Sequence, residues 1–291
     1  MTAPQLAPPQ SSQPTPQSSR IAATFAALRQ AGRVALMPYL TVGYPDVETT
    51  IAGIHGLVRG GADLIELGMP FSDPLADGVT VQRANQRALQ GGARTRTVLE
   101  VVRQVRAEGV EVPLLAMGYY NPIYHFGPEA FVAACAEVGI DGLIVPDLPP
   151  EESDELGAAC REHGRDLIML LAPTSTEERI AEVARRATGF IYCISLTGTT
   201  GARANLATGL ADYLARVRRH TALPLAIGFG IAKAEHVAEV ARLADGAIVG
   251  AALLNRLEQV EDRPVAERAA ALEEFVRGLR PPLQASARPN V

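Results

Sequence analysis

The sequence predicts an α/β fold in which eight parallel strands close into a barrel surrounded by helices, a (β/α)8 TIM barrel. Short runs rich in Val, Ile and Leu alternate with longer amphipathic segments along most of the 291 residues, which is typical of a parallel sheet. Eight strand–helix units can be counted, the number that a closed barrel needs. Glycine-rich segments suited to phosphate binding follow the last strands, as they do in such barrels.

Each expected strand is a short apolar run. The eight strands are expected at Val34–Thr41, Asp63–Gly68, Val112–Gly118, Gly142–Val145, Leu167–Leu171, Gly189–Ile194, Leu223–Ile227 and Gly246–Val249. Between them, apolar residues recur near the 3.6-residue period of a helix. Helices are expected at Val47–Arg59, Thr95–Glu108, Pro128–Val138, Glu151–Glu162, Thr176–Ala187, Leu206–Arg219 and Ala234–Leu243, with an additional N-terminal helix before the first strand.

The alternative fold is an open doubly wound sheet, which normally has a Gly-rich turn after its first strand. Here the first strand ends in Thr41–Pro45, which does not match that turn. This difference favours the barrel, which we place in a single domain over residues 20–280.

The two ends of the chain are expected to lie outside that domain. Residues 1–19 consist almost entirely of Pro, Gln, Ser, Thr and Ala, a composition that cannot offset the entropy of ordering. They and residues 281–291 are expected to be disordered tails. The chain has no signal-peptide pattern and no apolar run near the roughly 18 residues of a membrane span. We therefore expect a cytoplasmic protein without membrane association.

Charge and cysteine content narrow the function further. The formal net charge is −5, and no cluster of Lys or Arg is interleaved with aromatic residues, so a nucleic-acid partner is not expected. The three cysteines, Cys135, Cys160 and Cys193, are widely spaced in apolar or helical context. They are expected to be reduced packing residues, with no disulfide and no metal site.

A carboxylate stands in the second expected strand. Because side chains alternate along a strand, Leu64, Glu66 and Gly68 share one face and Ile65 and Leu67 the other. The aliphatic pair suits the helix-facing side, so Glu66 is expected to point into the barrel mouth. A buried carboxylate without partners usually becomes protonated or acquires a function. A structural ion pair inside the barrel is the alternative.

The loop after this strand carries two more acids. Asp73 precedes Pro74 and Asp77 precedes Gly78, and both pairs are also ordinary turn sequences. Asp77 is the better candidate because its loop overhangs Glu66. Asp147, at the end of the fourth strand, is a further candidate to orient Glu66 or Thr41, with a structural role as the alternative.

Glycines after the seventh and eighth strands suggest a phosphate site. Gly228 and Gly230 follow one strand and Gly250 the next, where backbone N–H groups and helix N-termini can bind an anion. The polar segment Ser195–Arg203, after the sixth strand, is expected to be a lid over a bound phosphate.

The run Glu66–Gly78 resembles the signature of the tryptophan synthase α chain family. The similarity extends through Pro38–Pro45, Val145–Ser153, Ser195–Arg203 and Gly228–Ile231, and covers nearly everything from Arg20 to Leu279. The resemblance implies a carbon–carbon lyase of tryptophan biosynthesis, which cleaves indole-3-glycerol phosphate to indole and glyceraldehyde 3-phosphate by a retro-aldol reaction.

The resemblance also implies the roles of individual residues. Glu66 and Asp77 would be the catalytic carboxylates, supported by Tyr192. The indole would lie against Tyr39, Met117, Ile144, Leu170, Tyr192 and Phe229, and the phosphate against Thr200, Gly201, Gly230, Gly250 and Ala251. Two positions depart from the family pattern: Ala251 stands where serine is common, and Tyr39 where phenylalanine is frequent.

The residue types suit this chemistry. Cleavage requires a proton delivered to indole C3 and a base for the adjacent hydroxyl, which one carboxyl group can supply in turn. Glu66 is the candidate, and an ionised Asp77 facing the indole N–H would stabilise the charge that develops there. The pKa of Glu66 should therefore be raised by apolar surroundings while Asp77 stays ionised.

Partners follow from the family. No cofactor is expected in this chain, and pyridoxal phosphate is expected in a β subunit with which it would form an α2β2 heterotetramer. The loops Pro70–Gly78 and Asn121–Gly127 carry candidate exposed anchors for that subunit, namely Phe71, Leu75, Ile123, Tyr124 and Phe126.

Three other functions stay open. They are a different phosphosugar barrel enzyme such as an isomerase or epimerase, a stand-alone indole-glycerol phosphate lyase, and a degenerate barrel that only activates a partner. The histidines His55, His163, His220 and His236 are expected on helix surfaces far from the strand mouths.

Overall fold

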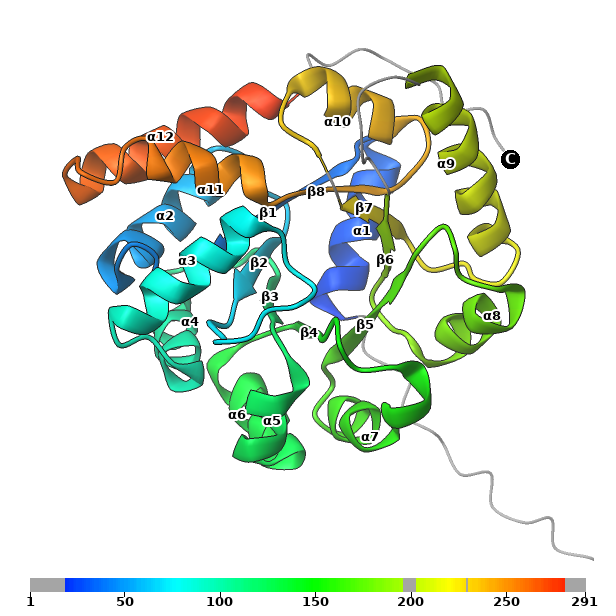
Figure 1. The fold of residues 1–291 in the computed structure, drawn as a ribbon, viewed down its shortest axis with the longest axis horizontal. Helices are drawn as coiled ribbons and strands as arrows, with labels where there is room; N and C mark the ends of the chain where they lie inside the picture. The colour runs from blue at the N-terminus through cyan, green and yellow to red at the C-terminus, as the bar shows by residue number, and fades with distance from the viewer. Residues whose placement is uncertain (1–18, 196–202, 229, 281–291) are drawn as a thin grey trace, which may run out of the picture.

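Eight parallel strands form the centre of the molecule (Figure 1). The computed structural model describes residues 19–195, 203–228 and 230–280. The strands are β1 (Ala35–Thr41), β2 (Ile65–Gly68), β3 (Leu114–Met117), β4 (Gly142–Ile144), β5 (Asp166–Leu171), β6 (Ile191–Ile194), β7 (Leu225–Gly228) and β8 (Gly246–Val249). Each strand pairs with the next along the chain, and β8 pairs with β1 to close the barrel. The predicted fold class is confirmed.

Helices surround the strands on all sides (Figure 1). They are α1 (Arg20–Gln30), α2 (Val47–Arg59), α3 (Val79–Gln90), α4 (Thr95–Ala107), α5 (Tyr120–Phe126), α6 (Pro128–Val138), the 3₁₀ helix η1 (Pro150–Glu152), α7 (Asp154–Glu162), α8 (Glu177–Arg186), α9 (Arg203–Arg218), α10 (Ala234–Ala241), α11 (Ala251–Glu258) and α12 (Val265–Leu279). The expectation of a loop over Asn121–Gly127 is wrong, because most of this segment is helix α5. The tails expected at both ends and most of the expected lid lie outside the described residues.

Side chains alternate between the barrel interior and the helix layer. Leu64 belongs to the interior cluster, whereas Ile65 and Leu67 pack in the cluster between strands and helices. The buried residues of the interior cluster that lie on or beside the strands are Ala35, Met37, Leu64, Leu115, Ile144, Ile168, Phe190, Ala226 and Ile248. The period of two along each strand explains this division. The face predicted for Glu66 is therefore the inner one.

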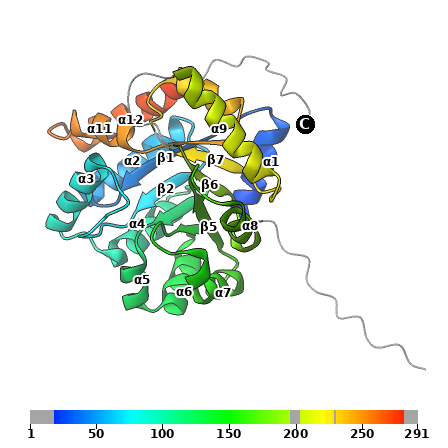
Figure 2. The same cartoon turned by 45° about the vertical axis from the view of Figure 1, so that its right-hand side comes forward.

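Helix α1 closes one end of the barrel. Its Ile21, Phe25 and Leu28 are buried and pack with the interior cluster, and the Phe25 and Phe190 rings lie 5.7 Å apart between centroids. The helix lies within the outline of the strands in Figure 1 and at one end of them in Figure 2. The additional N-terminal helix expected from the sequence therefore fills the end of the barrel where the strands begin, which leaves the other end for a site.

Acidic residues hold the beginnings of the strands together. Three aspartates each accept a hydrogen bond from the backbone N–H of a neighbouring strand: Asp63 from Leu36, Asp141 from Leu114 and Asp245 from Leu225. Asp141 is 5% exposed and also forms ion pairs of 2.7 Å with both Arg20 and Arg106. Each of these buried charges is thus compensated, as buried charges need to be.

The described residues contain neither a helix long and apolar enough to cross a membrane nor a group of three or more His, Cys, Asp or Glu side chains arranged around a metal ion. All three cysteines are buried free thiols.

We expect Asp141→Ala to lower the free energy of unfolding by about 3–5 kcal/mol, because Arg106 and the Leu114 N–H would lose a buried partner. Urea denaturation measures this. The matched control is Glu137→Ala, which removes an exposed ion pair with Arg103 and should change stability by less than about 1 kcal/mol. Equal losses in both variants would refute the role given to Asp141.

Candidate active site

Glu66 of β2 lies on the inner side of the barrel without a hydrogen-bonding partner among the described residues. It is fully buried, and both carboxylate oxygens lack a partner among the described residues. Burial raises the pKa of Glu66 to about 8, because an ionised carboxylate loses its hydration in apolar surroundings. The structural ion pair considered from the sequence is not formed within the described part of the chain. Glu66 therefore carries a proton at neutral pH.

Two tyrosines border this carboxyl group. Tyr39 of β1 is the register partner of Glu66, and Tyr192 of β6 lies close enough that the charge of Glu66 raises its pKa in addition to the larger effect of burial. Gly68 and Gly228 make room for the two rings, because a Cβ at either position would overlap a tyrosine hydroxyl. The absence of side chains at the ends of β2 and β7 thus lets both tyrosine rings lie close against these strands.

Asp77 lies on the loop between β2 and α3 and is held by Tyr119. The Tyr119 hydroxyl donates a 3.1 Å hydrogen bond to the Asp77 carboxylate and accepts one of 2.9 Å from the backbone N–H of Ala76. The Tyr119 ring also stacks on Phe71, with 5.2 Å between centroids. Tyr119 therefore fixes the loop at the residue next to Asp77 and at Asp77 itself.

The two carboxyl groups differ in protonation. Burial raises the pKa of Asp77 to about 6, and the hydrogen bond from Tyr119 limits this rise. Between about pH 6 and about pH 8, Asp77 is mostly ionised while Glu66 is mostly protonated. The site thus holds one carboxylic acid and one carboxylate at the same pH. In such a pair, the neutral group can donate a proton while the ionised group stabilises positive charge.

Sequence reasoning missed Tyr119. The sequence feature that could have indicated it is its position two residues after the end of β3. The ends of neighbouring parallel strands meet at the same edge of the barrel, so a residue there can reach the loop after β2.

The apolar residues expected to contact indole gather around the inner wall. Ile144 belongs to the interior cluster, and Met117, Leu170 and Tyr192 pack against it while remaining partly exposed. These four residues come from the ends of β3 to β6, and Met117 pairs in register with Ile144 as Leu170 does with Tyr192. They form an apolar surface on the inner wall. Phe229 lies outside the described residues.

The glycine segments after β7 and β8 lie on adjacent strands, since Gly228 pairs in register with Ile248. Gly250 is the N-cap of α11, and its carbonyl accepts from the N–H groups of Leu253 and Leu254. The first N–H groups of a helix have no acceptor within it and favour an anion. Gly230 has a φ of +69°, which glycine adopts without strain.

The remaining residues expected at the phosphate differ in how far the structure describes them. Ala251 is exposed at the start of α11. Thr200 and Gly201 lie outside the described residues.

The Asp147 carboxylate accepts a hydrogen bond from the Tyr120 backbone N–H at the start of α5, which supports the structural role that the sequence left open for it. Two predicted placements are wrong. Ile123 is fully buried, because α5 turns it toward the core. His236 is not remote from the strand mouths, because its ring contacts the loop after β7.

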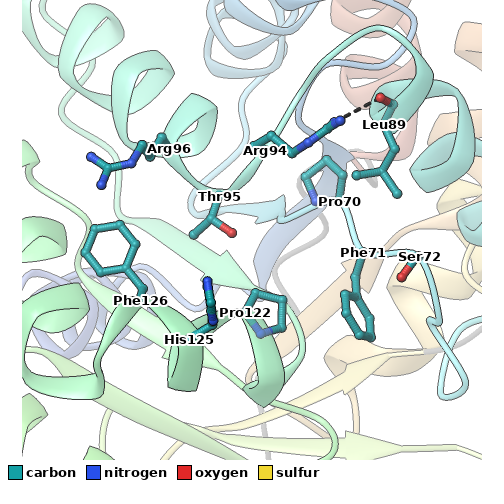
Figure 3. Close-up of a pocket in the computed structure, with 10 residues that line it drawn as sticks. All are labelled: Pro70, Phe71, Ser72, Leu89, Arg94, Thr95, Arg96, Pro122, His125 and Phe126. Atoms are coloured by element: carbon teal, nitrogen blue, oxygen red, sulfur yellow. Dashed lines mark hydrogen bonds between the residues drawn. The ribbon is translucent and has the colours of Figure 1, made fainter.

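A separate surface cavity of about 630 Å³ lies beside the mouth (Figure 3). It is lined by Pro70, Phe71, Ser72, Leu89, Arg94, Thr95, Arg96, Pro122, His125 and Phe126. The Arg96 guanidinium lies 5.2 Å from the centroid of the Phe126 ring. Neither Glu66 nor Asp77 lines this cavity, so it is separate from the two carboxyl groups.

Comparison with known proteins identifies the family. Residues 25–281 match the family model described as tryptophan synthase alpha chain. The chain is 55% identical over 262 residues to the tryptophan synthase alpha chain of Roseiflexus sp. (strain RS-1), covering 90% of this chain and 99% of the relative. It is 52% identical over 271 residues to that of Chloroflexus aurantiacus, covering 93% and 100%.

Solved structures agree with the sequence comparison. The tryptophan synthase subunit alpha from Legionella pneumophila superposes with a TM-score of 0.83 at 38% identity, covering 90% of this chain and 97% of that one. A chain of the aminoacrylate-bound tryptophan synthase from M. tuberculosis gives a TM-score of 0.79 at 36% identity, covering 90% and 100%. On the matching family model and these relatives, this closed barrel belongs to the tryptophan synthase alpha chain family.

Proposed function

We propose that this chain cleaves indole-3-glycerol phosphate to indole and glyceraldehyde 3-phosphate, with Glu66 as the acid and base and Asp77 as the ionised stabilising group. The observation that carries this assignment is the fully buried carboxyl group of Glu66, which has no hydrogen-bonding partner among the described residues. Its pKa is raised to about 8, while that of Asp77, which acts on Tyr39 and Tyr192 as Glu66 does, is about 6. The cleavage proposed here needs a proton donor for indole C3 and a negatively charged group beside the indole nitrogen.

Glu66 suits the proton transfers. In its neutral form it donates a proton to indole C3, which converts the ring to an indolenine with positive charge at nitrogen. The resulting carboxylate then accepts the proton of the side-chain hydroxyl next to the breaking bond. The electrons of that C–C bond return to the ring, and indole and the aldehyde are released. The same proton-transfer group thus acts first as acid and then as base.

Asp77 suits the charge that develops on the indole nitrogen. Its carboxylate is partly buried and fixed by Tyr119, so it can accept a hydrogen bond from the indole N–H without moving. A fixed negative group in a poorly hydrated site stabilises such a charge more than water does. Tyr192 and Tyr39 pack beside Glu66 and support its position, and burial raises their pKa values further above the ordinary tyrosine value.

The rest of the substrate fits the same mouth. Met117, Ile144 and Leu170 provide apolar surface for the indole ring. Gly230, Gly250 and Ala251 provide backbone N–H groups for the phosphate, and we include Thr200, Gly201 and Phe229 by their motif positions. Ala251 lacks the hydroxyl common in the family, which leaves its backbone N–H as the donor.

The other functions are less well supported. An isomerase or epimerase would share the phosphate segments, but membership of the tryptophan synthase alpha chain family favours the lyase. A degenerate, purely activating barrel does not explain two carboxyl groups held in different protonation states. A stand-alone lyase has the same site, and only the dependence on a partner distinguishes it.

We propose that the partner is a β subunit that carries pyridoxal phosphate, in a cytoplasmic α2β2 assembly. Support comes from apolar side chains exposed near the mouth: Leu75 is 91% exposed, Val79 69% and Tyr124 65%. Phe71 and Phe126 are only partly exposed. Exposed apolar groups clustered around one site are typical of a protein interface.

We expect Glu66→Gln to lower kcat by about 10²–10⁴-fold, because the amide cannot transfer the proton. The substrate should still bind, since Gln has nearly the same shape. Indole release measures turnover, and equilibrium titration with indole-3-glycerol phosphate measures binding. A variant that keeps more than roughly a tenth of the wild-type rate would exclude Glu66 as the proton-transfer group.

The pH profile of kcat/KM should be bell-shaped, with an acid limb near pH 6 from Asp77 and an alkaline limb near pH 8 from Glu66. Tyr119→Phe removes the hydrogen bond that lowers the pKa of Asp77, so the acid limb should move to higher pH while the alkaline limb stays in place. Asp77→Asn is the reference variant, because it lacks the titrating carboxyl group and its pH profile should have no acid limb from this residue. An acid limb unaffected by Tyr119→Phe would contradict the assignment.

Leu75→Asp should weaken binding of the β subunit by at least about tenfold, because it places a charge at an exposed apolar anchor. Titration of the β subunit, followed by indole release and by calorimetry, measures affinity and activation. The control is Ala26→Asp on the exposed side of α1 at the opposite end of the barrel. Equal affinity of both variants for the β subunit would show that Leu75 does not lie in the interface. Absence of activation of the wild type by the β subunit would favour a stand-alone lyase.

A further inference from the structure

The side chain of His236 folds back onto the loop that precedes its own helix. His236 is the third residue of α10. Its ring Nδ1 lies 3.1 Å from the carbonyl oxygen of Gly230 and 3.3 Å from the backbone nitrogen of Ala232. Both groups belong to the segment between β7 and α10, so one imidazole nitrogen connects the first turn of the helix to the loop.

Either of these hydrogen bonds fixes the loop backbone. A protonated Nδ1 donates a hydrogen bond to the Gly230 carbonyl. An unprotonated Nδ1 accepts one from the Ala232 N–H, so the nitrogen makes one of the two hydrogen bonds at a time. The peptide bond between Gly230 and Ile231 is planar and trans, so its N–H points away from its carbonyl. When His236 holds the carbonyl, it also fixes the direction of the Ile231 N–H.

This loop lies next to the other glycine segment of the mouth. β7 and β8 are neighbours, with Gly228 opposite Ile248, so the Gly230 loop stands beside Gly250 and the start of α11. Gly230 has a φ of +69°, and glycine has more backbone freedom to lose than any other residue. A loop of this kind needs an anchor if its N–H groups are to be directed at a ligand before it binds.

We propose that His236 is a positioning residue for the substrate phosphate: its ring holds the Gly230–Ala232 backbone in the conformation that receives the anion. This inference rests on the proposed function, because it takes the loops after β7 and β8 as the phosphate site. His236 acts through the backbone and does not touch the reacting atoms. Its loss should therefore affect phosphate affinity and leave the proton transfers of Glu66 unchanged.

A purely structural role for His236 makes a different prediction. A residue that only stabilises the start of α10 would lower the thermal stability in every variant that loses the ring, without a selective effect on phosphate. His236→Asn separates the two roles, because asparagine places an oxygen or an NH2 group near the position of Nδ1 and can make either hydrogen bond. His236→Ala can make neither. Glu239→Ala, at an exposed position of the same helix, is the matched control.

The experiment compares the wild type with His236→Ala, His236→Asn and Glu239→Ala. KM and kcat are measured for indole-3-glycerol phosphate, and the Kd of inorganic phosphate by calorimetry. We expect His236→Ala to raise both KM and the phosphate Kd by about tenfold, the effect of one ordinary hydrogen bond, with kcat within about twofold. His236→Asn should recover most of the affinity, and Glu239→Ala should match the wild type.

Three results would overturn the inference: an unchanged phosphate Kd in His236→Ala, an equal loss in His236→Asn, or a fall in kcat without a change in KM. Failure of the wild type to release indole would refute the proposed function instead. The calorimetric comparison of phosphate affinity distinguishes the two cases, because it does not depend on turnover.

Discussion

The site depends on one constraint, which is that Glu66 is enclosed in the barrel with no hydrogen-bonding partner for either carboxylate oxygen among the described residues. Removal from water opposes ionisation, so the pKa of Glu66 rises to about 8 and the side chain keeps a proton at neutral pH. The inner wall of the barrel creates this environment, in which Tyr39 and Tyr192 lie near the carboxyl group. The fold thus maintains an acid that would be ionised at the surface.

The two ends of the barrel differ in whether their carboxyl groups have charged and backbone partners. Where the strands begin, Asp63, Asp141 and Asp245 each accept a backbone N–H group and pair with arginine. Where the strands end, the described residues offer Glu66 no such partner and offer the Asp77 carboxylate a neutral tyrosine hydroxyl. Compensated aspartates hold one end of the barrel together, while uncompensated carboxyl groups at the other end keep shifted pKa values. This division matches the general separation of stability and catalysis between the two faces of such barrels.

Much of this arrangement could be predicted from the sequence. The alternation along Asp63–Gly68 correctly placed Glu66 inside, because a period of two leaves little choice of face once Ile65 and Leu67 are assigned to the helices. Long-range contacts were harder to predict. The hydrogen bonds of Tyr119 to Asp77 and of His236 to Gly230 depend on how loops fold back in space. The segment Asn121–Gly127, expected to be a loop, is mostly helix α5, which buries Ile123. Local patterns thus predicted the strands, whereas the contacts that tune the site required coordinates.

The protonation state of Glu66 is the most direct test of this account. Difference infrared spectroscopy of the wild type against Glu66→Gln isolates the carbonyl band of one protonated carboxyl group, and it can be followed through a pH titration without substrate. The account predicts that this band is present at pH 7 and disappears as the pH rises through about 8. Absence of the band at pH 7, with ionisation complete near the ordinary glutamate pKa of about 4.3, would contradict it.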